Sequence, residues 1–351
     1  MAYQTQTDTG LQMLKQDIRN HQLRRMYIFY GEETFLLHHY LEQVKKQAID
    51  PLTESFNFHK LTKENFDIQV LADAVESLPM MAETTFVWID DIDIFKLSDT
   101  DRTKMVEIFS DIPDYCTLIL TFEVTPWKPD KRYKKLWDAI ETFALTVEFP
   151  KQGQRELVAW ITRHFAAEGK TIDPQLCVYL IEMTGGTMTT LAGEISKIAA
   201  YSDNEIVVKS DIDAVTEPVL DAVVFQMTDC IMEGQYGPAL LKLQQLLKLQ
   251  EKPLAILGAI GLHVRQIGTA LTLYNDGQNA YDLVRLCGMK DYAAKKIMSK
   301  AKRFSAHFCA VAAQLVMETD FQIKTSRDDP ERLLEMLLLR LAEEARNGQH
   351  S

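Results

Sequence analysis

The hydrophobic pattern of roughly the first 150 residues alternates between strand and helix signals. Two runs, 85–89 and 116–122, are continuous and apolar, as expected for strands buried on both faces of a helix-covered parallel sheet. Shorter strand patterns occupy 27–30, 56–61 and 145–149, and apolar positions at helical spacing occupy 35–44 and 67–78. This alternation predicts an α/β domain with a parallel sheet over residues 1–150.

Beyond Pro150 the pattern becomes helical. Stretches of helical period between 156 and 201, separated by glycines, indicate a small helical domain over residues 151–215. From 221 almost to the end the same period continues, interrupted mainly by glycine and proline, which predicts an all-α bundle over residues 216–351. The two ends of the chain are predicted to be disordered.

Composition is that of a globular protein with more than one domain. A chain of 351 residues is too long for a single hydrophobic core of ordinary size. Its content of 46% hydrophobic and 25% charged residues argues against a disordered protein. No uninterrupted apolar run approaches the ~18 residues of a membrane span, and the first residues lack the features of a signal peptide. Five scattered cysteines without a C-x-x-C pair favour reduced thiols. We therefore expect a cytoplasmic protein that does not associate with membranes.

The negative charge is concentrated in the first domain. The formal net charge is −12, and residues 1–150 carry 16 basic and 25 acidic side chains. Such a domain is not expected to wrap nucleic acid through electrostatics alone. A stand-alone DNA-binding protein, one alternative function, is disfavoured by this charge and by the isoelectric point near 5.2.

The segment after the first strand has the outline of a phosphate-binding loop without its chemistry. In a P-loop NTPase, a G-x-x-x-x-G-K-[ST] motif at this place surrounds phosphate with backbone N–H groups, a lysine and a hydroxyl. Here Gly31 is followed by Glu32, Glu33 and Thr34, and the second glycine and the lysine are missing. Carboxylates at a helix start are favoured by the helix dipole and would repel a polyanion. We expect this degenerate loop (Gly31, Glu32, Glu33 and Thr34) not to bind nucleotide.

The next buried strand ends in two carboxylates, Asp90 and Asp91, and so resembles a Walker B strand, which holds Mg²⁺ in an active ATPase. Without a lysine to anchor phosphate, we interpret both as vestigial or as residues that cap a loop. The eight histidines are dispersed, and no nucleophile and base can be paired from the sequence. No catalytic residue, metal or cofactor is expected.

The segment Leu78-Pro79-Met80-Met81 follows a predicted helix that stops before the proline. Met80 and Met81 are consecutive, so both cannot face the same core from a regular element, and at least one is expected to project. The alternative is an ordinary helix end tucked into the core. Two projecting apolar side chains could anchor an interface as hot spots.

Two basic clusters are candidates for contacts with DNA or with another subunit. Lys131 and Arg132 lie in the first cluster, after the strand at 116–122, and Lys295, Lys296 and Lys300 lie in the second, on a predicted helix. For each, the alternative is a solvated surface.

Four segments resemble one family, the delta subunit of the bacterial DNA polymerase III clamp loader. They are Tyr30–Leu37, Ser77–Glu83, Gly185–Lys197 and Asp320–Ser326, and the resemblance runs from about Tyr27 to Ala345. It implies an AAA+-like domain with a degenerate P-loop, a small helical lid and an all-α bundle that forms a collar.

The resemblance also implies a function. The family binds the ring-shaped sliding clamp (beta) and opens one of its interfaces for loading onto primed DNA, within a hetero-pentamer of clamp-loader subunits. It does not hydrolyse ATP itself, and it meets DNA through the complex. The clamp-binding position matches Leu78-Pro79-Met80-Met81, where other members often have aromatic or leucine side chains; methionine suits shallow apolar pockets. The alternative is an active AAA+-type ATPase with an atypical phosphate loop.

Overall fold

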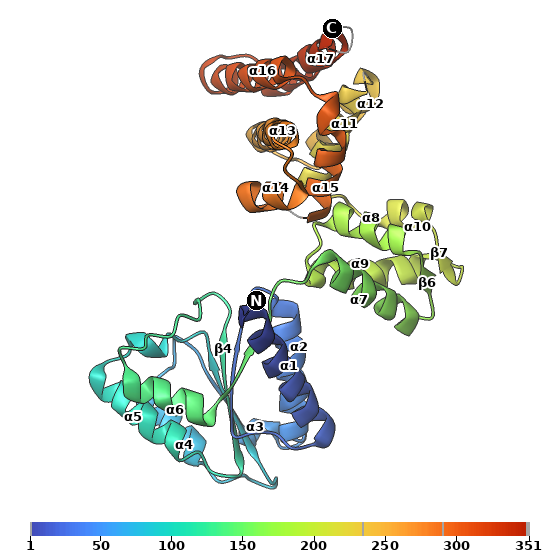
Figure 1. Cartoon of the computed structure of the whole chain (residues 1–351). Coiled ribbons are helices and arrows are strands. Elements are labelled where there is room, and N and C mark those ends of the chain that lie inside the picture. Colours follow the sequence, from blue (N-terminus) through green and yellow to red (C-terminus); the bar gives the residue numbers. More distant parts are fainter. Residues whose placement is uncertain (1, 234, 290, 349–351) are drawn as a thin grey trace. The chain divides into compact units, whose positions relative to one another are not determined.

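The structure is a computed structural model that describes residues 2–233, 235–289 and 291–348. It comprises two compact units, one up to Gln152 and one from Gly153 onward (Figure 1). The finer division of the second unit at residue 215 stays a prediction.

The first unit is built on a parallel sheet. In the described part of the chain this sheet has five strands in the order β2-β3-β4-β1-β5. The strands are β1 (Met26–Tyr30), β2 (Phe58–Leu61), β3 (Thr85–Asp90), β4 (Cys116–Phe122) and β5 (Leu145–Glu148). Every neighbouring pair is parallel, and β4, buried along its whole length, lies between β3 and β1. The two continuous apolar runs therefore occupy the interior of the sheet.

Helices cover both faces of this sheet (Figure 1). They are α1 (Ala2–Asn20), α2 (Thr34–Ala48), α3 (Glu54–Asn57), α4 (Ile68–Glu76), the 3-10 turn η1 (Ile94–Lys96), α5 (Asp99–Ser110) and α6 (Lys134–Phe143). Met26 and Ile28 of β1 pack in one core cluster with α4, α5 and α6. Tyr27 and Phe29 pack in a second cluster with α1 and α2. The predicted α/β fold class is confirmed.

The prediction of a disordered amino terminus is wrong. Residues Ala2–Asn20 form α1, which packs on β5 and buries Leu14 completely. Gly10 allows α1 to approach β5 closely, because a Cβ at this position would lie 2.6 Å from the carbonyl oxygen of Thr146. The carboxyl-terminal residues 349–351 lie outside the described residues, so that part of the prediction is not tested.

The second unit begins with short helices and a small parallel pair of strands. Its elements are α7 (Gln154–Ala167), β6 (Thr171–Ile172), α8 (Pro174–Thr184), α9 (Met188–Tyr201), β7 (Ile206–Val207) and α10 (Lys209–Val215). The local sequence sets the limits of α8. The Asp173 carboxylate accepts a hydrogen bond from the Gln175 N–H at 2.7 Å, and Gly185 ends the helix with a φ of 77°.

The remaining elements are helical, as the sequence predicted. They are α11 (Leu220–Met232), α12 (Tyr236–Lys248), α13 (Pro253–Asn275), α14 (Ala280–Cys287), α15 (Asp291–Lys300), the turn η2 (Ala301–Arg303), α16 (Ala306–Thr325) and α17 (Pro330–Gly348). Two core clusters hold them together, and side chains of α13 enter both. By length and composition alone α13 could cross a membrane, although His263, Arg265 and Gln266 interrupt its apolar sequence. Its buried side chains pack against α11 and α16, the position of a core helix.

Candidate functional site

The predicted site residues of the first unit lie at opposite edges of the sheet. All strands run in the same direction, so segments that precede strands meet at one edge and segments that follow strands meet at the other. Residues 77–84, called here the 77–84 loop, precede β3, whereas Asp90 and Asp91 follow its apolar part. The degenerate loop follows β1. The six residues of β3 separate the two edges by roughly 20 Å, at about 3.3 Å per residue.

The 77–84 loop presents both methionines to solvent. Helix α4 ends at Glu76, and Ser77 is already extended. Leu78 is 72% exposed, Met80 56% and Met81 91%. Met81 has a φ of 54°, a left-handed conformation that is costly for a residue with a Cβ. Both methionines therefore project, where the sequence predicted at least one, and the backbone of the loop is strained at Met81.

A buried asparagine fixes this loop, and the sequence interpretation missed it. Asn57, at the end of α3, is completely buried. Its Oδ1 accepts a hydrogen bond from the Met80 N–H at 2.7 Å, and its Nδ2 donates to the Met80 carbonyl at 2.9 Å. Residues 56–61 had been predicted as one strand, but Phe56 and Asn57 belong to α3. The Phe-Asn-Phe alternation fits a half-buried strand, and only the structure shows that Asn57 is buried.

Exposed apolar side chains also lie beside Asn57. Phe56, its neighbour in α3, and Leu52, just before α3, are both exposed. A third hydrogen bond, from the Thr84 hydroxyl to the Ala48 carbonyl, connects the far end of the 77–84 loop to the end of α2. The apolar surface at this edge of the sheet is therefore carried by two segments that hydrogen bonds hold together.

The backbone of the degenerate loop packs closely against the backbone of Phe149, the residue that follows β5. Gly31 has a φ of 136°, and a Cβ there would lie 2.2 Å from the Phe149 carbonyl oxygen. That carbonyl accepts a hydrogen bond from the Glu33 N–H at 3.0 Å, and the Phe149 N–H donates to the Tyr30 carbonyl at 2.7 Å. An N–H group at the helix start, which a P-loop would offer to phosphate, is thus already paired. Thr34 begins α2.

The two glutamates of the degenerate loop differ in their surroundings. Glu33 is buried, whereas Glu32 is exposed. Burial raises the pKa of Glu33, and the Phe35 amide and the positive charge of Lys151 offset part of this rise. Glu33 therefore occupies the start of α2 with an acidic side chain, as the sequence indicated, while Glu32 faces solvent.

Asp90 and Asp91 are both engaged within the first unit. Asp90 forms an ion pair with Lys60 at 2.9 Å and accepts a hydrogen bond from the Thr121 hydroxyl. The Asp91 carboxylate accepts the N–H groups of Glu123, Val124 and Thr125, the last at 2.7 Å, and it pairs with Lys63 at 2.8 Å. Among the described residues, no three His, Cys, Asp or Glu side chains form a group that could hold a metal. Asp91 acts here as an anchor for the loop after β4.

The pKa of Asp91 yields a testable pH dependence. Burial raises this pKa, but the hydrogen bonds from Lys63, Thr125 and Glu123 outweigh burial and hold it below its usual range. A depressed carboxyl pKa contributes stability that is complete above the unfolded value of about 3.9 and is lost as the pH falls through the folded pKa. Between about pH 6 and pH 3 we expect the denaturation midpoint of the first unit to fall further in the wild type than in Asp91→Asn. If the denaturation midpoints of the wild type and of Asp91→Asn fall equally with pH, Asp91 does not stabilise the first unit in this way.

The predicted basic contacts largely have partners within the chain. Arg132 pairs with Asp130 at 2.6 Å, and the Lys131 ammonium lies 5.3 Å from the centre of the Trp137 ring. On α15, Lys295 is exposed. Lys300 pairs with Asp229 of α11 at 2.8 Å, and Lys296 lies between Asp229 and Glu182 of α8 at 3.6 and 3.9 Å. Contacts of these residues with DNA or another subunit stay a prediction, and for Lys296 and Lys300 they would compete with ion pairs that join helices.

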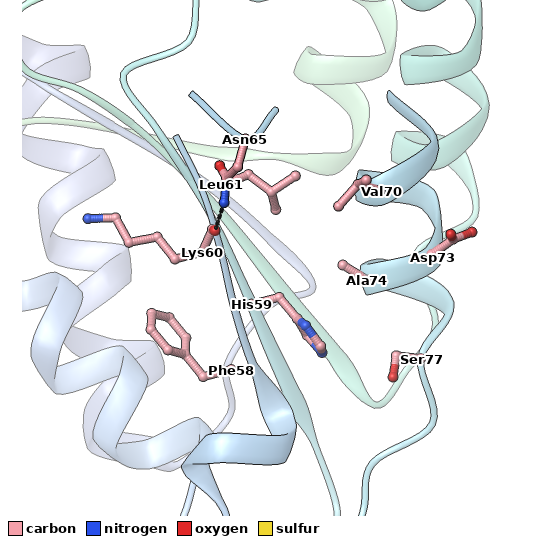
Figure 2. A pocket seen from close by; sticks show the side chains of 9 residues that line it. All are labelled: Phe58, His59, Lys60, Leu61, Asn65, Val70, Asp73, Ala74 and Ser77. Carbon is pink, nitrogen blue, oxygen red and sulfur yellow. Dashed lines mark hydrogen bonds between the residues drawn. The ribbon is translucent and has the colours of Figure 1, made fainter. Parts of the chain in front are cut away.

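A shallow hollow lies between β2 and α4 (Figure 2). It has a volume of about 390 Å³ and is lined by Phe58, His59, Lys60, Leu61, Asn65, Val70, Asp73, Ala74 and Ser77. The His59 ring points from the strand toward α4, and its Nε2 has no hydrogen-bond partner among the described residues. Burial lowers the pKa of His59, which favours the neutral ring. Among the described residues, no hydrogen bond joins the His59 Nε2 atom to Ser77 on the opposite side of the hollow.

Comparison with known proteins places the chain in a family. The family model described as DNA polymerase III, delta subunit, matches residues 27–149, and the model of the C-terminal domain of the same subunit matches residues 221–341. The chain is 23% identical over 330 residues to DNA polymerase III subunit delta of Bacillus subtilis, covering 92% of this chain and 94% of the relative. It is 18% identical over 274 residues to a probable subunit delta of Aquifex aeolicus, covering 76% of each.

A solved structure has the same fold. The DNA clamp loader delta protein of Bacillus subtilis matches with a TM-score of 0.65 and 21% identity, covering 94% of this chain and 98% of that chain. The matched family regions contain the 77–84 loop, the degenerate loop and most of the helical bundle. The chain belongs to the DNA polymerase III delta subunit family.

Proposed function

We propose that this chain is a clamp-loader subunit that binds the sliding clamp of DNA polymerase III and helps to open it for loading onto primed DNA. The main support for this proposal is the 77–84 loop. Leu78, Met80 and Met81 are exposed together there, and hydrogen bonds from Asn57 hold the Met80 backbone. Pro79 prevents α4 from continuing through these residues. Large apolar side chains held away from a core are the kind of anchor that fills a pocket on a partner. The name of the similar Bacillus subtilis structure supports the same role.

We infer further that the chain does not hydrolyse ATP. A phosphate at the degenerate loop would find no lysine in the loop, and the Glu33 N–H already donates to Phe149. A Mg²⁺ ion at the end of β3 would have to displace Lys60 from Asp90, and both Lys63 and three backbone N–H groups from Asp91. On this proposal, nucleotide chemistry belongs to other subunits.

Equilibrium binding of a fluorescent ATP analogue with Mg²⁺ tests this absence of nucleotide chemistry. We expect no saturable binding up to about 1 mM, because the loop itself lacks the lysine of a P-loop and its helix-terminal N–H is paired. An ATP-hydrolysing clamp-loader subunit, measured in parallel, is the positive control. Tight binding that requires Mg²⁺ would favour the alternative, an active AAA+-type ATPase.

The same proposal assigns a function to each predicted domain. We assign residues 1–150 to clamp binding, residues 151–215 to a lid and residues 216–351 to a collar that assembles with other clamp-loader subunits in a hetero-pentamer. DNA would be met through the assembled complex, with Lys131, Arg132 and Lys295 as candidate contacts on exposed surface. The five free cysteines are consistent with the reducing cytoplasm.

A further inference from the structure

Asn57 makes contacts that suit a residue built to hold a loop. Its side-chain amide binds the N–H and the carbonyl of the same residue, Met80, and its Nδ2 also donates to the Thr53 carbonyl at 3.1 Å. Asn57 is completely buried, although Met80 itself is half exposed. Since a buried amide without partners is costly, the loop and the asparagine each require the other.

The loop needs such a support. Met81 adopts a left-handed backbone with a φ of 54°, and such a residue persists only when its surroundings determine it. Leu78, Met80 and Met81 are each more than half exposed, so their side chains contribute little buried surface that would keep the loop in place. Outside regular structure, the hydrogen bonds from Asn57 and the bond from Thr84 to Ala48 link the loop to α3 and α2.

We propose that Asn57 is a positioning residue, which holds Met80 and Met81 in the conformation that binds the partner. This inference rests on the proposed clamp-binding function of the 77–84 loop. A loop ordered before binding loses less conformational entropy when it binds, so the support raises affinity without touching the partner. The shape of the binding surface is thereby set by a residue 23 positions earlier in the chain.

The wild-type chain supplies the first test. Hydrogen exchange of backbone amides is measured on the full chain without any partner. We expect the Met80 N–H to be protected although it lies in an exposed loop, and we expect Asn57→Ala to speed its exchange at least about tenfold while amides of β3 keep their rates. An unprotected Met80 N–H in the wild type, or an unchanged rate in the variant, would overturn the proposal.

Binding to the cognate sliding clamp supplies the second test. Asn57→Ala is expected to weaken binding by about tenfold in the wild-type background and by less than about twofold when Met80 and Met81 are already alanine, because the effect passes through those side chains. Equal losses in both backgrounds would show that Asn57 acts independently of them. If Asn57→Ala does not fold, Asn57→Asp serves instead, since it keeps the acceptor for the Met80 N–H and loses both donated bonds.

Asn65 offers a matched control. It forms hydrogen bonds with Thr62 and with the Lys60 carbonyl, in the turn that follows β2 and outside the 77–84 loop. Asn65→Ala is expected to leave Met80 exchange and clamp affinity unchanged. If the Met80 and Met81 alanine variant binds the clamp normally, the proposed function fails, whereas the exchange experiment still decides whether Asn57 orders the loop.

Discussion

Replacing both Met80 and Met81 with alanine is expected to weaken binding to the sliding clamp by about 100-fold or more while leaving the chain folded. Each side chain is large, apolar and more than half exposed, so its truncation removes little from the core. If both fill a pocket on the clamp, each is expected to contribute about 2 kcal/mol as a hot spot, although the two values need not add. A calorimetric titration of the full chain with the cognate clamp measures the change.

The same chain offers a control of matched chemistry. Met317 on α16 and Met336 on α17 are 72% and 53% exposed, similar to Met81 and Met80, but lie in the other unit. Alanine at both positions is expected to leave clamp affinity unchanged. An unaltered affinity in the Met80 and Met81 variant, or an equal loss in the control pair, would contradict the proposed site.

Gly31→Ala is expected to destabilise the first unit by at least about 3 kcal/mol. The backbone at Gly31 has a φ of 136°, and the added Cβ would meet the carbonyl oxygen, carbonyl carbon and nitrogen of Phe149 at 2.2, 2.6 and 2.7 Å. These are backbone atoms whose hydrogen bonds join β1, the segment after β5 and the start of α2. They cannot move without breaking those bonds. Chemical denaturation followed through signals of the first unit measures the loss.

Alanine substitutions at two other glycines distinguish the cost of backbone strain from the cost of the steric clash with Phe149. Gly169 has a φ of 72° with open space around its Cβ position, so Gly169→Ala is expected to cost only about 1 kcal/mol of backbone strain. Gly193 lies within α9 with open space beside it, and Gly193→Ala is expected to stabilise by about 0.5–1 kcal/mol. If Gly31→Ala costs no more than Gly169→Ala, the loop at Gly31 is looser than the structure indicates.

The retained outline of a phosphate loop thus has a structural reason. Gly31 is required by the contact with Phe149, whether or not a phosphate ever binds. Asp91 likewise keeps a role, since it anchors three successive N–H groups after β4. Residues at positions that bind nucleotide in an ATPase therefore have a structural role in this fold that does not depend on nucleotide.

Local patterns predicted most of the regular structure. The run at 116–122 matched β4 in full, because an apolar pattern of this kind acts over a few residues. The one-turn helix α3 was missed, since four residues cannot show a helical period. The amino-terminal helix was missed because its packing on β5 depends on the segment around Thr146, far along the chain.

The sequence by itself determined the α/β order of the first unit, the helical character of the second, the missing lysine after Gly31 and the Met-Met pair after Pro79. Only the tertiary structure decided that Met80 and Met81 are exposed together, that Asn57 forms hydrogen bonds with the Met80 backbone, and that Lys296 and Lys300 form ion pairs. The reason is the distance along the sequence over which each kind of interaction acts. Periodicity, capping and missing residue types act between near neighbours, whereas Asn57 reaches Met80 across 23 positions and Asp91 reaches Thr125 across 34, distances that only the strand order closes.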